Sequence, residues 1–423
     1  MANEFSKEER VAFDLALEGF NDGLVVSSIV ARQSTEAEKM ERSNDTFWRP
    51  MPYIMASHDG TDATGNFTGA TQLSVPASIG FNKHVAVPMT AKQLRDSLQE
   101  GRLGSAAAQK LASDVNKSVL DVACSYGSVV SKRTTAASGY SDVAELDSLF
   151  SEQGIGKEDR LYALSSRDYN SMAGDLAARQ TMNEMPTEAF RRSYVGDVAG
   201  YQTFKLDYAN RLTASAGTTV TINGANQRHV PKATSTAATG ETSNVDNRFM
   251  TLSITVGSGT VKVGDAFTIA GVNAVHHITK GDTGTLKTFR IVEVLTGAGG
   301  TGTVKITPAI VATDSAPGNA EVQYQNVTAT PADGAAITFL NTADAAINPF
   351  WHKSAIELLP ATVGIKDGSG LSVMRATTDQ GVELVMSKQA GVDTLDTKYR
   401  WDCSWGVAAL NPEMMGIQLF SQT

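Results

Sequence analysis

Residues 90–132 read TAKQLRDSLQEGRLGSAAAQKLASDVNKSVLDVACSYGSVVSK. Thr90 and Gln93 have the spacing of a helical capping box, and apolar side chains recur every three or four residues from Leu111 to Tyr126. This period is typical of a helix with one buried face, although two glycines near its start favour a kink. A helix of this span is about twice as long as a common globular helix, so we expect it to lie along an elongated body.

The composition of the chain excludes several classes of function. Its 423 residues suffice for more than one domain with a substantial core. A formal net charge of −9 argues against a nucleic-acid-binding protein, because such proteins need a basic surface. The polar N-terminus lacks the apolar segment of a signal peptide, and no apolar run approaches the length of a membrane span. We therefore expect a soluble, unexported chain in which Cys124 and Cys403 are reduced.

A second helix is predicted near the N-terminus, where Ser6 and Glu9 form another capping box. Asp14, Glu18 and Asp22 follow at steps of four residues and share one face of this helix. Like charges at this spacing cost about 0.2 to 0.5 kcal/mol per pair. A solvated acidic face is the simpler interpretation, and a docking face for a basic partner is the alternative.

Residues 46–89 predict an extended hairpin. Strand-like runs at 47–54 and 70–79 flank a stretch rich in Gly, Asp and Thr, and the prolines of this segment favour edge strands over a helix. A two-stranded ribbon is marginally stable alone, so we expect it to lie on another subunit.

The rest of the chain predicts a mixed α/β core with a β-rich domain inserted into it. In the core we expect helices at 141–153 and 168–179 and a strand at 160–165. Residues 213–348 are rich in Thr, Gly, Ala and Val, and their strand candidates lie at 249–256, 266–269, 272–278, 288–295 and 303–307. This spacing fits a small antiparallel barrel or sandwich. Core strands then resume at 355–359, 371–377, 382–387, 399–409 and 415–420.

Motifs for an enzyme or a metal site are missing from the sequence. Gly297, Gly299 and Gly302 match a dinucleotide-binding pattern, but a strand follows them where the pyrophosphate site needs a helix, which favours a hairpin loop. His276 and His277 are adjacent in a predicted strand, so they would point to opposite faces and could not share a metal. We expect structural histidines, no catalytic residue, no metal and no cofactor.

Several short blocks carry a resemblance to a known family. They are SNDTFW at 43–48, LRD at 94–96, AQKLA at 108–112, VDNRF at 245–249, GD at 264–265, AGV at 270–272, ITP at 306–308, NPFW at 348–351 and GVAALNPE at 406–413. In this order and spacing they resemble the major capsid (coat) proteins of tailed bacteriophages, in the P-twenty-two-like podovirus branch.

The resemblance implies an α+β fold of the Hong-Kong-ninety-seven type with an inserted small all-β barrel. The implied parts are an N-terminal arm (1–45), an extended hairpin loop (46–89), a spine helix of the peripheral domain (90–132), the first part of the axial domain (133–212), the inserted barrel (213–348), and closing strands of the axial and peripheral domains (349–423). The arm, hairpin, long helix and mixed core are also predicted from the residues themselves.

The resemblance also implies a non-enzymatic function in a virion. The chain would assemble in the host cytoplasm, with a scaffolding protein and a portal protein, into pentamers and hexamers of an icosahedral procapsid. The shell would mature on packaging double-stranded DNA, which it encloses without specific binding, and would contact no membrane. Asp14 and Glu18 fall where relatives bind the basic end of the scaffolding protein.

Two further sets of contact residues follow from the resemblance. A loop of the inserted domain that reaches a neighbouring capsomer in relatives corresponds here to Thr234, Glu241, Asp246 and Asn247, and it is rich in Thr, Ala and Gly with few charges. The residues expected to make extended-loop contacts are Arg49, His58, Asp59, Asp62 and Lys83.

Two other classes of protein remain open. A bacterial nanocompartment shell protein shares the fold but would need neither a scaffolding protein nor an inserted domain. A ligand-binding or hydrolytic protein could instead use the β-rich domain, and close pairs of acids on its surface or glycan affinity would favour that reading.

Overall fold

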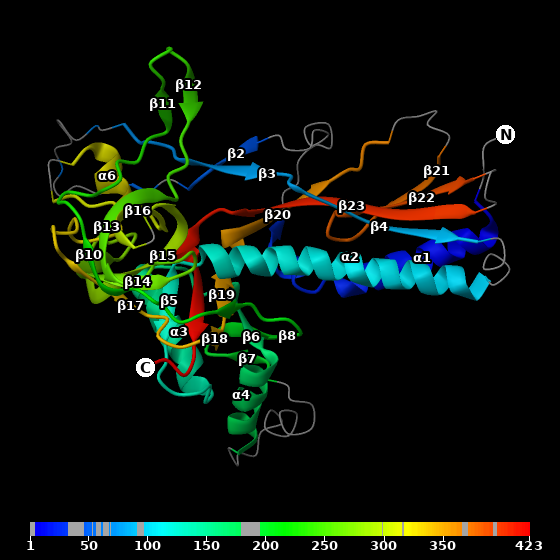
Figure 1. Cartoon of the computed structure of the whole chain (residues 1–423), viewed down its shortest axis with the longest axis horizontal. Helices are drawn as coiled ribbons and strands as arrows, with labels where there is room; N and C mark the ends of the chain where they lie inside the picture. Colours follow the sequence, from blue (N-terminus) through cyan, green and yellow to red (C-terminus); the bar gives the residue numbers. More distant parts are fainter. Residues whose placement is uncertain are drawn as a thin grey trace. The chain divides into compact units, whose positions relative to one another are not determined.

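The computed structural model describes residues 5–32, 46–52, 54–55, 61, 67, 69–90, 97–178, 195–297, 299–314, 317–365, 371–391 and 396–423. The chain divides into two compact units, each assembled from three separate segments (Figure 1). Unit 1 consists of Met1–Phe47, Ala77–Val122 and Ile356–Ala408, and unit 2 consists of Trp48–Pro76, Ala123–Ala355 and Ala409–Thr423.

Unit 1 is built on a six-stranded sheet. Its strands are β1 (Ala31–Arg32), β20 (Ile356–Ala361), β23 (Thr397–Ala409), β22 (Glu383–Ala390) and β21 (Ser372–Thr377) in spatial order, with β4 (Phe81–Met89) also paired with β23. The long β23 is antiparallel to β4 from Thr397 opposite Met89 to Trp405 opposite Phe81. The end of the predicted hairpin segment therefore belongs to a sheet formed with the C-terminal strands of its own chain.

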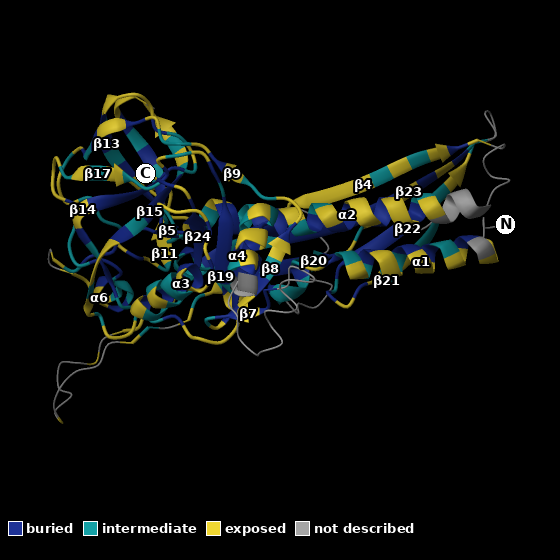
Figure 2. Cartoon of the chain, turned by 90° about the horizontal axis from the view of Figure 1, so that it is seen from below, coloured by how far each residue is buried: buried dark blue, intermediate teal, exposed yellow. Residues whose placement is uncertain are grey.

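Two helices, α1 (Lys7–Gly23) and α2 (Ser97–Tyr126), accompany this sheet (Figure 2). The Trp405 indole N–H donates to Ser118 Oγ at 2.8 Å, which ties β23 to α2. Ala16 of α1 and Trp401 of β23 both approach Gly104, so a small residue on α2 lets helix and sheet pack closely. Short 3₁₀ turns follow α1 at η1 (Ser27–Ile29) and precede β20 at η4 (Lys353–Ala355).

The long helix is confirmed, but its predicted C-terminal end is wrong. α2 ends at Tyr126, and Val129–Lys132 form strand β5 instead. A Cβ at Gly127 would stand 3.2 Å from the backbone of Gly416. The β-branched residues Val129 and Val130 follow and pair with β24. The predicted capping box at Thr90 and Gln93 falls partly outside the described residues.

Unit 2 contains a second six-stranded sheet. In spatial order its strands are β5, β24 (Met415–Leu419), β19 (Asn348–His352), β6 (Arg160–Ser165), β8 (Tyr201–Leu206) and β7 (Asp197–Val198). α3 (Tyr140–Gln153) and α4 (Ser166–Ala178) confirm the two helices predicted for this part of the core. An aromatic cluster fills the core, with ring centroids of Phe150 and Phe350 5.0 Å apart and Tyr201 edge-on to Phe350. The 3₁₀ turn η5 (Pro412–Met414) leads into β24.

The β-rich segment forms a closed barrel within unit 2. Around the barrel the strands are β10 (Thr218–Ile222), β13 (Met250–Ser258), β16 (Gly300–Thr307), β15 (Asp282–Thr296), β14 (Ala266–Val275) and β17 (Ala336–Phe339). Alternate residues point inward, so Leu252, Ile254, Phe267, Phe289 and Val304 are buried in one apolar core. Gly297 and Gly299 lie between the antiparallel strands β15 and β16, and Gly302 lies in β16, which confirms the predicted hairpin loop.

Smaller elements are attached to the barrel. They are the hairpin β11 (Thr234–Thr236) and β12 (Thr242–Asn244), the helix α6 (Asn319–Tyr324), the pair β9 (Arg211–Leu212) and β18 (Ala345–Ala346), and the ribbon β2 (Thr46–Pro50) and β3 (Ser74–Ser78). Tyr324 Oη donates to the Thr71 carbonyl, so the base of the ribbon segment is bound to α6.

Two details of the barrel differ from the predictions. The strands predicted at 266–269 and 272–278 are one strand, β14, with a shift in register between Thr268 and Asn273 that Gly271 allows at φ +79°. The strand ends at Val275, so His276 and His277 lie in the following turn. Sequence analysis also missed β10 and β17, the short strands that close the barrel.

Candidate assembly surfaces

The hairpin formed by β11 and β12 carries the predicted inter-capsomer residues (Figure 1). All residues from Thr234 to Asn244 are exposed, and Glu241 lies at the turn. The remaining two predicted residues lie at the base of the hairpin and make contacts within the chain. Asp246 binds both Nε and Nη2 of Arg248, at 2.9 and 2.7 Å.

Asn247 fixes the hairpin to the barrel. Its Oδ1 accepts from the Lys232 amide at 3.0 Å, and its Nδ2 donates to the carbonyls of Lys232 and Val245 at 2.9 and 3.0 Å. One side chain therefore joins the two ends of the hairpin. Thr234 and Glu241 remain candidates for contacts with other subunits, whereas Asp246 and Asn247 are in positions that support the hairpin.

The second candidate surface is the exposed face of α1. Phe13, Ala16 and Phe20 are buried, while Asp14 and Glu18 are exposed on the opposite side. The predicted capping box at the start of this helix is confirmed, since Ser6 Oγ accepts from the Glu9 amide and Glu9 accepts from the Ser6 amide.

Glu9 also binds α1 to the sheet of unit 1. Its Oε1 pairs with Lys388 Nζ and accepts from Tyr399 Oη at 2.8 Å, while Glu9 itself is 5% exposed. Burial would raise the pKa of this carboxyl, but the hydrogen bonds from Lys388, Ser6 and Tyr399 outweigh burial and lower the pKa. The acidic face of α1 is therefore presented from a helix that is held in place.

The residues predicted for extended-loop contacts are only partly described. Arg49 lies half-buried on β2, and Lys83 lies exposed on β4 opposite Cys403. His58, Asp59 and Asp62 lie outside the described residues.

Unit 2 contains a buried ion pair that sequence analysis did not predict. Lys287 of β15 is 1% exposed, and its Nζ lies 2.6 Å from Glu413 Oε1 in the turn before β24. Asn326 donates to the same oxygen at 3.1 Å and to the Ala309 carbonyl at 2.8 Å. Burial would raise the pKa of Glu413, but Lys287, His277 and Asn326 outweigh it and lower the pKa to about 2.

His277 lies on the other side of the same carboxylate. Its Nε2 is 3.8 Å from Glu413 Oε2, and burial lowers the pKa of the imidazole to about 4 against the opposing effect of Glu413. The His277 side chain is 17% exposed and neutral at neutral pH, which fits the predicted structural role. Its neighbour His276 accepts from the Ile278 and Thr279 amides and so closes the turn.

A second buried cation joins the barrel to the C-terminal end of α2. Arg290, also on β15, donates to the carbonyls of Gly264, Cys124 and Gly127 at 3.0, 3.0 and 3.3 Å. Burial lowers the pKa of its guanidinium to about 10, so it stays charged at neutral pH. The signal that could have found these residues is that Lys287 and Arg290 alternate with apolar residues and threonines in the middle of one strand.

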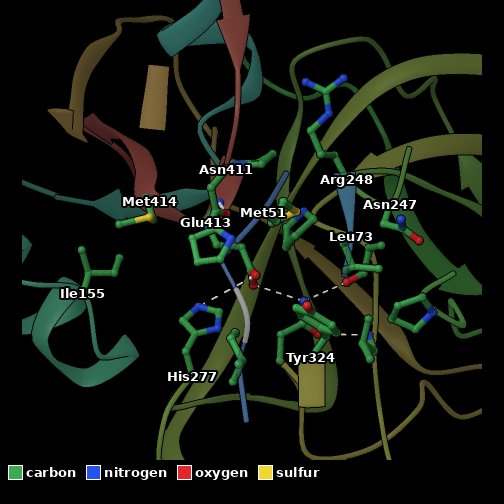
Figure 3. A pocket seen from close by; sticks show the side chains of 18 of the residues that line it. Met51, Leu73, Ile155, Asn247, Arg248, His277, Tyr324, Asn411, Glu413 and Met414 are labelled. Carbon is green, nitrogen blue, oxygen red and sulfur yellow. Dashed lines mark hydrogen bonds and ion pairs between the residues drawn. The ribbon is translucent and has the colours of Figure 1, made fainter. Parts of the chain in front are cut away.

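A cavity of about 310 Å³ lies beside Glu413 and His277 (Figure 3). Its wall is mostly apolar, with Met51 and Leu73 from the ribbon segment and Ile155 after α3. Its described lining includes no serine, threonine or cysteine, and the hydroxyl of Tyr324 in this lining donates to the Thr71 carbonyl at 2.8 Å. In the described part of the chain, no cluster of three or more His, Cys, Asp or Glu could hold a metal ion.

None of the described helices combines the length and the apolar character that crossing a membrane requires. The exposed hairpin of β11 and β12 and the acidic face of α1 are the candidate surfaces for contacts with other proteins.

Comparison with solved structures gives phage chains at low identity and one coat-protein domain at higher identity. The chain is 9% identical to a chain of Mycobacterium phage Che8, with 95% of this chain and 92% of that chain covered and a TM-score of 0.44. It is 12% identical to the capsid chain of cyanophage P-SCSP1u, with coverage of 93% and 87% and a TM-score of 0.43. The CUS-3 coat protein I-domain is 40% identical over 31% of this chain and 98% of that chain, with a TM-score of 0.22.

Comparison with protein families gives a match over almost the whole chain. The family model of the P22 coat protein, gene protein 5, matches residues 1–421. The α+β fold with a closed β-barrel agrees with the fold expected from the sequence resemblance. The chain therefore belongs to the P22 coat protein family and is a structural component of a bacteriophage capsid.

Proposed function

We propose that this coat protein co-assembles with a separate scaffolding protein into pentamers and hexamers of an icosahedral procapsid. In this proposal a portal protein occupies one vertex, and the shell matures as double-stranded DNA is packaged. Rings and shell close through contacts between different surfaces of identical chains. The six parts expected from the sequence resemblance, from the arm at 1–45 to the closing strands at 349–423, are proposed as its domains.

The observation that carries the scaffolding part is the exposed acidic row on α1. Asp14, Glu18 and Asp22 repeat every four residues on the exposed face. Neither Asp14 nor Glu18 has a hydrogen bond or ion pair to another described residue. Each unneutralised pair at this spacing costs about 0.2 to 0.5 kcal/mol, so a basic partner that meets the row relieves an existing repulsion.

Apolar side chains beside the row support a protein partner. Val11 and Leu15 of the same helix are 51% and 53% exposed. A basic amphipathic helix could cover both, because its apolar face would meet Val11 and Leu15 while its lysines and arginines meet Asp14 and Glu18. Each such contact can be weak because many of them act together in the shell. Weak contacts let a misplaced subunit dissociate during assembly.

Charge reversal tests this proposal. The variant Asp14→Lys, Glu18→Lys is co-expressed with the scaffolding protein, and particles are analysed by sedimentation and negative-stain electron microscopy. We expect folded coat protein that no longer incorporates the scaffolding protein, because the two new lysines would repel the basic residues of that protein. The matched control is Glu152→Lys, Glu158→Lys, which changes the net charge equally at two exposed acids of unit 2. Unchanged scaffold incorporation by the α1 variant would show that the row is only a solvated face.

A further inference from the structure

The cavity beside Glu413 and His277 has the size of a small-molecule site. All of its described lining belongs to unit 2. Its volume of about 310 Å³ is roughly twice the volume of an apolar cavity that binds benzene, about 150 Å³. It also reaches the range of ordinary ligand pockets, which begins at about 300 Å³. A bicyclic aromatic body, or an aliphatic chain of similar volume, would therefore fit.

Most of the wall is apolar and comes from separate parts of the chain. The apolar lining includes Met51 and Leu73 of the ribbon segment, Ile155 after α3, Val311 after β16 and Met414 of η5. An apolar molecule that leaves water for this wall gains the hydrophobic free energy of the surface it buries. The two methionines are flexible, so they can adapt to the shape of a ligand.

Part of the wall is polar. His277 Nε2 is buried and has no hydrogen-bond partner among the described residues. Glu413 Oε2 lies 3.8 Å from it, which is too far for a hydrogen bond (Figure 3). The other oxygen of Glu413 is occupied by Lys287 and Asn326. A ligand group can therefore approach Nε2 and Oε2 together.

A hydroxyl group suits these two atoms. It both donates and accepts, so it can donate to Glu413 Oε2 while it accepts from an N–H at His277 Nε2. In the other tautomer of the ring it can donate to Nε2 instead. Hydrogen bonds of ordinary length, about 2.7 to 3.0 Å, reach both atoms from one oxygen placed between them.

The charges around the cavity disfavour an ionic ligand. Lys287 Nζ lies 2.6 Å from Glu413 Oε1 and balances that carboxylate, so a second cation gains little. A ligand carboxylate beside Oε2 would be repelled by Glu413. Arg248 is paired with Asp246, and burial lowers the pKa of His277 to about 4, so its ring is neutral at neutral pH. These pairings favour a neutral ligand.

We propose that this cavity is a binding site for a neutral molecule with an apolar body and one hydroxyl group, which hydrogen-bonds to His277 and Glu413. The class includes aliphatic and aromatic alcohols. Met51 and Leu73 belong to the ribbon segment, whereas His277 follows strand β14 of the barrel. A bound molecule would contact both and hold the base of the ribbon against the barrel. The site is built from a single chain, so the inference stands apart from the proposed assembly with a scaffolding protein.

Two probes that differ by one hydroxyl test the proposal. 2-Naphthol and naphthalene share a bicyclic body, and their binding to the full-length coat subunit is measured by equilibrium dialysis. We expect one saturable site per chain, with a Kd for 2-naphthol about three to ten times lower than that for naphthalene, which is the effect of one added hydrogen bond. The anion 2-naphthoate should bind more weakly than naphthalene. Equal Kd values for 2-naphthol and naphthalene, or binding that does not saturate, would overturn the proposal.

A variant without the ring nitrogen tests the polar contact. His277→Phe keeps a ring at this position but removes Nε2, so it should bind 2-naphthol no more tightly than naphthalene. An unchanged preference for 2-naphthol in this variant would overturn the assignment of the hydroxyl to His277.

A variant that fills the cavity tests the location. Leu73→Trp adds volume inside the cavity and should weaken the binding of both probes by about tenfold or more. The matched control is Leu286→Trp, at a 43% exposed position on β15 outside the described lining, which should bind like the parent. Thermal unfolding without probe shows that each variant is folded. Undiminished binding by folded Leu73→Trp places the probe elsewhere and overturns the proposal, and the two probes on the parent chain decide it if a variant does not fold.

Discussion

The two buried cations of β15, Lys287 and Arg290, each have specific partners. Lys287 meets Glu413, and Arg290 meets three carbonyl oxygens. Taking an ion out of water costs several kcal/mol, so such groups persist only where partners are fixed in place. At the residue scale Lys287 and Arg290 therefore link the barrel to η5 and to the C-terminal end of α2 through geometry that tolerates few substitutions.

His277 predicts a pH dependence of stability. Its pKa is about 4 in the folded chain and about 6.5 when unfolded, so protons favour the unfolded state between these values. The stabilisation is complete above about pH 6.5 and is lost as the pH falls through about 4, by about 3 kcal/mol in total.

The measurement is urea unfolding of the coat subunit at several pH values. His277→Gln cannot be protonated, so its free energy of unfolding should fall less than that of the parent between about pH 7 and about pH 4.5. His84→Gln, at an exposed position on β4, serves as the control and should follow the parent. Identical slopes for the parent and His277→Gln would contradict the argument.

At the scale of elements, Gly104 within α2 and Gly127 just after it have different structural roles. A Cβ at Gly104 would stand 3.5 Å from Ala16 Cβ, an ordinary contact, inside a continuous helix. A Cβ at Gly127 would stand 2.8 Å from the Ala123 carbonyl oxygen and 3.2 Å from the Gly416 backbone. The first glycine is replaceable, whereas the second allows the chain to leave the helix and enter β5.

Alanine at each position tests this distinction. Gly104→Ala should stabilise the subunit by about 0.5 to 1 kcal/mol, because alanine loses less backbone entropy in a helix. Gly127→Ala should destabilise it by about 1 to 3 kcal/mol, because backbone atoms must move. Thermal unfolding of the two variants beside the parent measures both. Equal effects of the two substitutions would contradict the assigned roles.

At the scale of the whole molecule, the acidic row predicts how assembly responds to salt. Charges are screened over about 10 Å at 0.1 M salt and about 3 Å at 1 M. Scaffold incorporation should therefore fall as salt rises. The Asp14→Lys, Glu18→Lys variant lacks the attraction between the acidic row and a basic partner, so its incorporation should not fall with salt. Salt-independent incorporation by the parent, measured by sedimentation of co-assembled particles, would contradict an electrostatic contact.

Local patterns in the sequence determined many of the elements. The capping box of Ser6 and Glu9, the apolar period of α2 and the strand at 160–165 are set by neighbouring residues, and all were predictable. Blocks spread along the chain predicted the family. The alternation of strands and turns after residue 213 predicted a small barrel or sandwich.

Contacts between distant residues were decided only by the tertiary structure. β10 and β17 are short and weakly patterned, and they become strands because they pair across the gap that closes the barrel. The pairing of β4 with β23 joins segments more than three hundred residues apart, as between Phe81 and Trp405. Lys287 and Glu413 likewise meet only after folding. The period of a sequence predicts which face one element buries, whereas a partner across the fold depends on topology. This is why the sequence alone determined the family and the elements, while the tertiary structure decided the partners of Lys287 and Arg290 and the closure of the barrel.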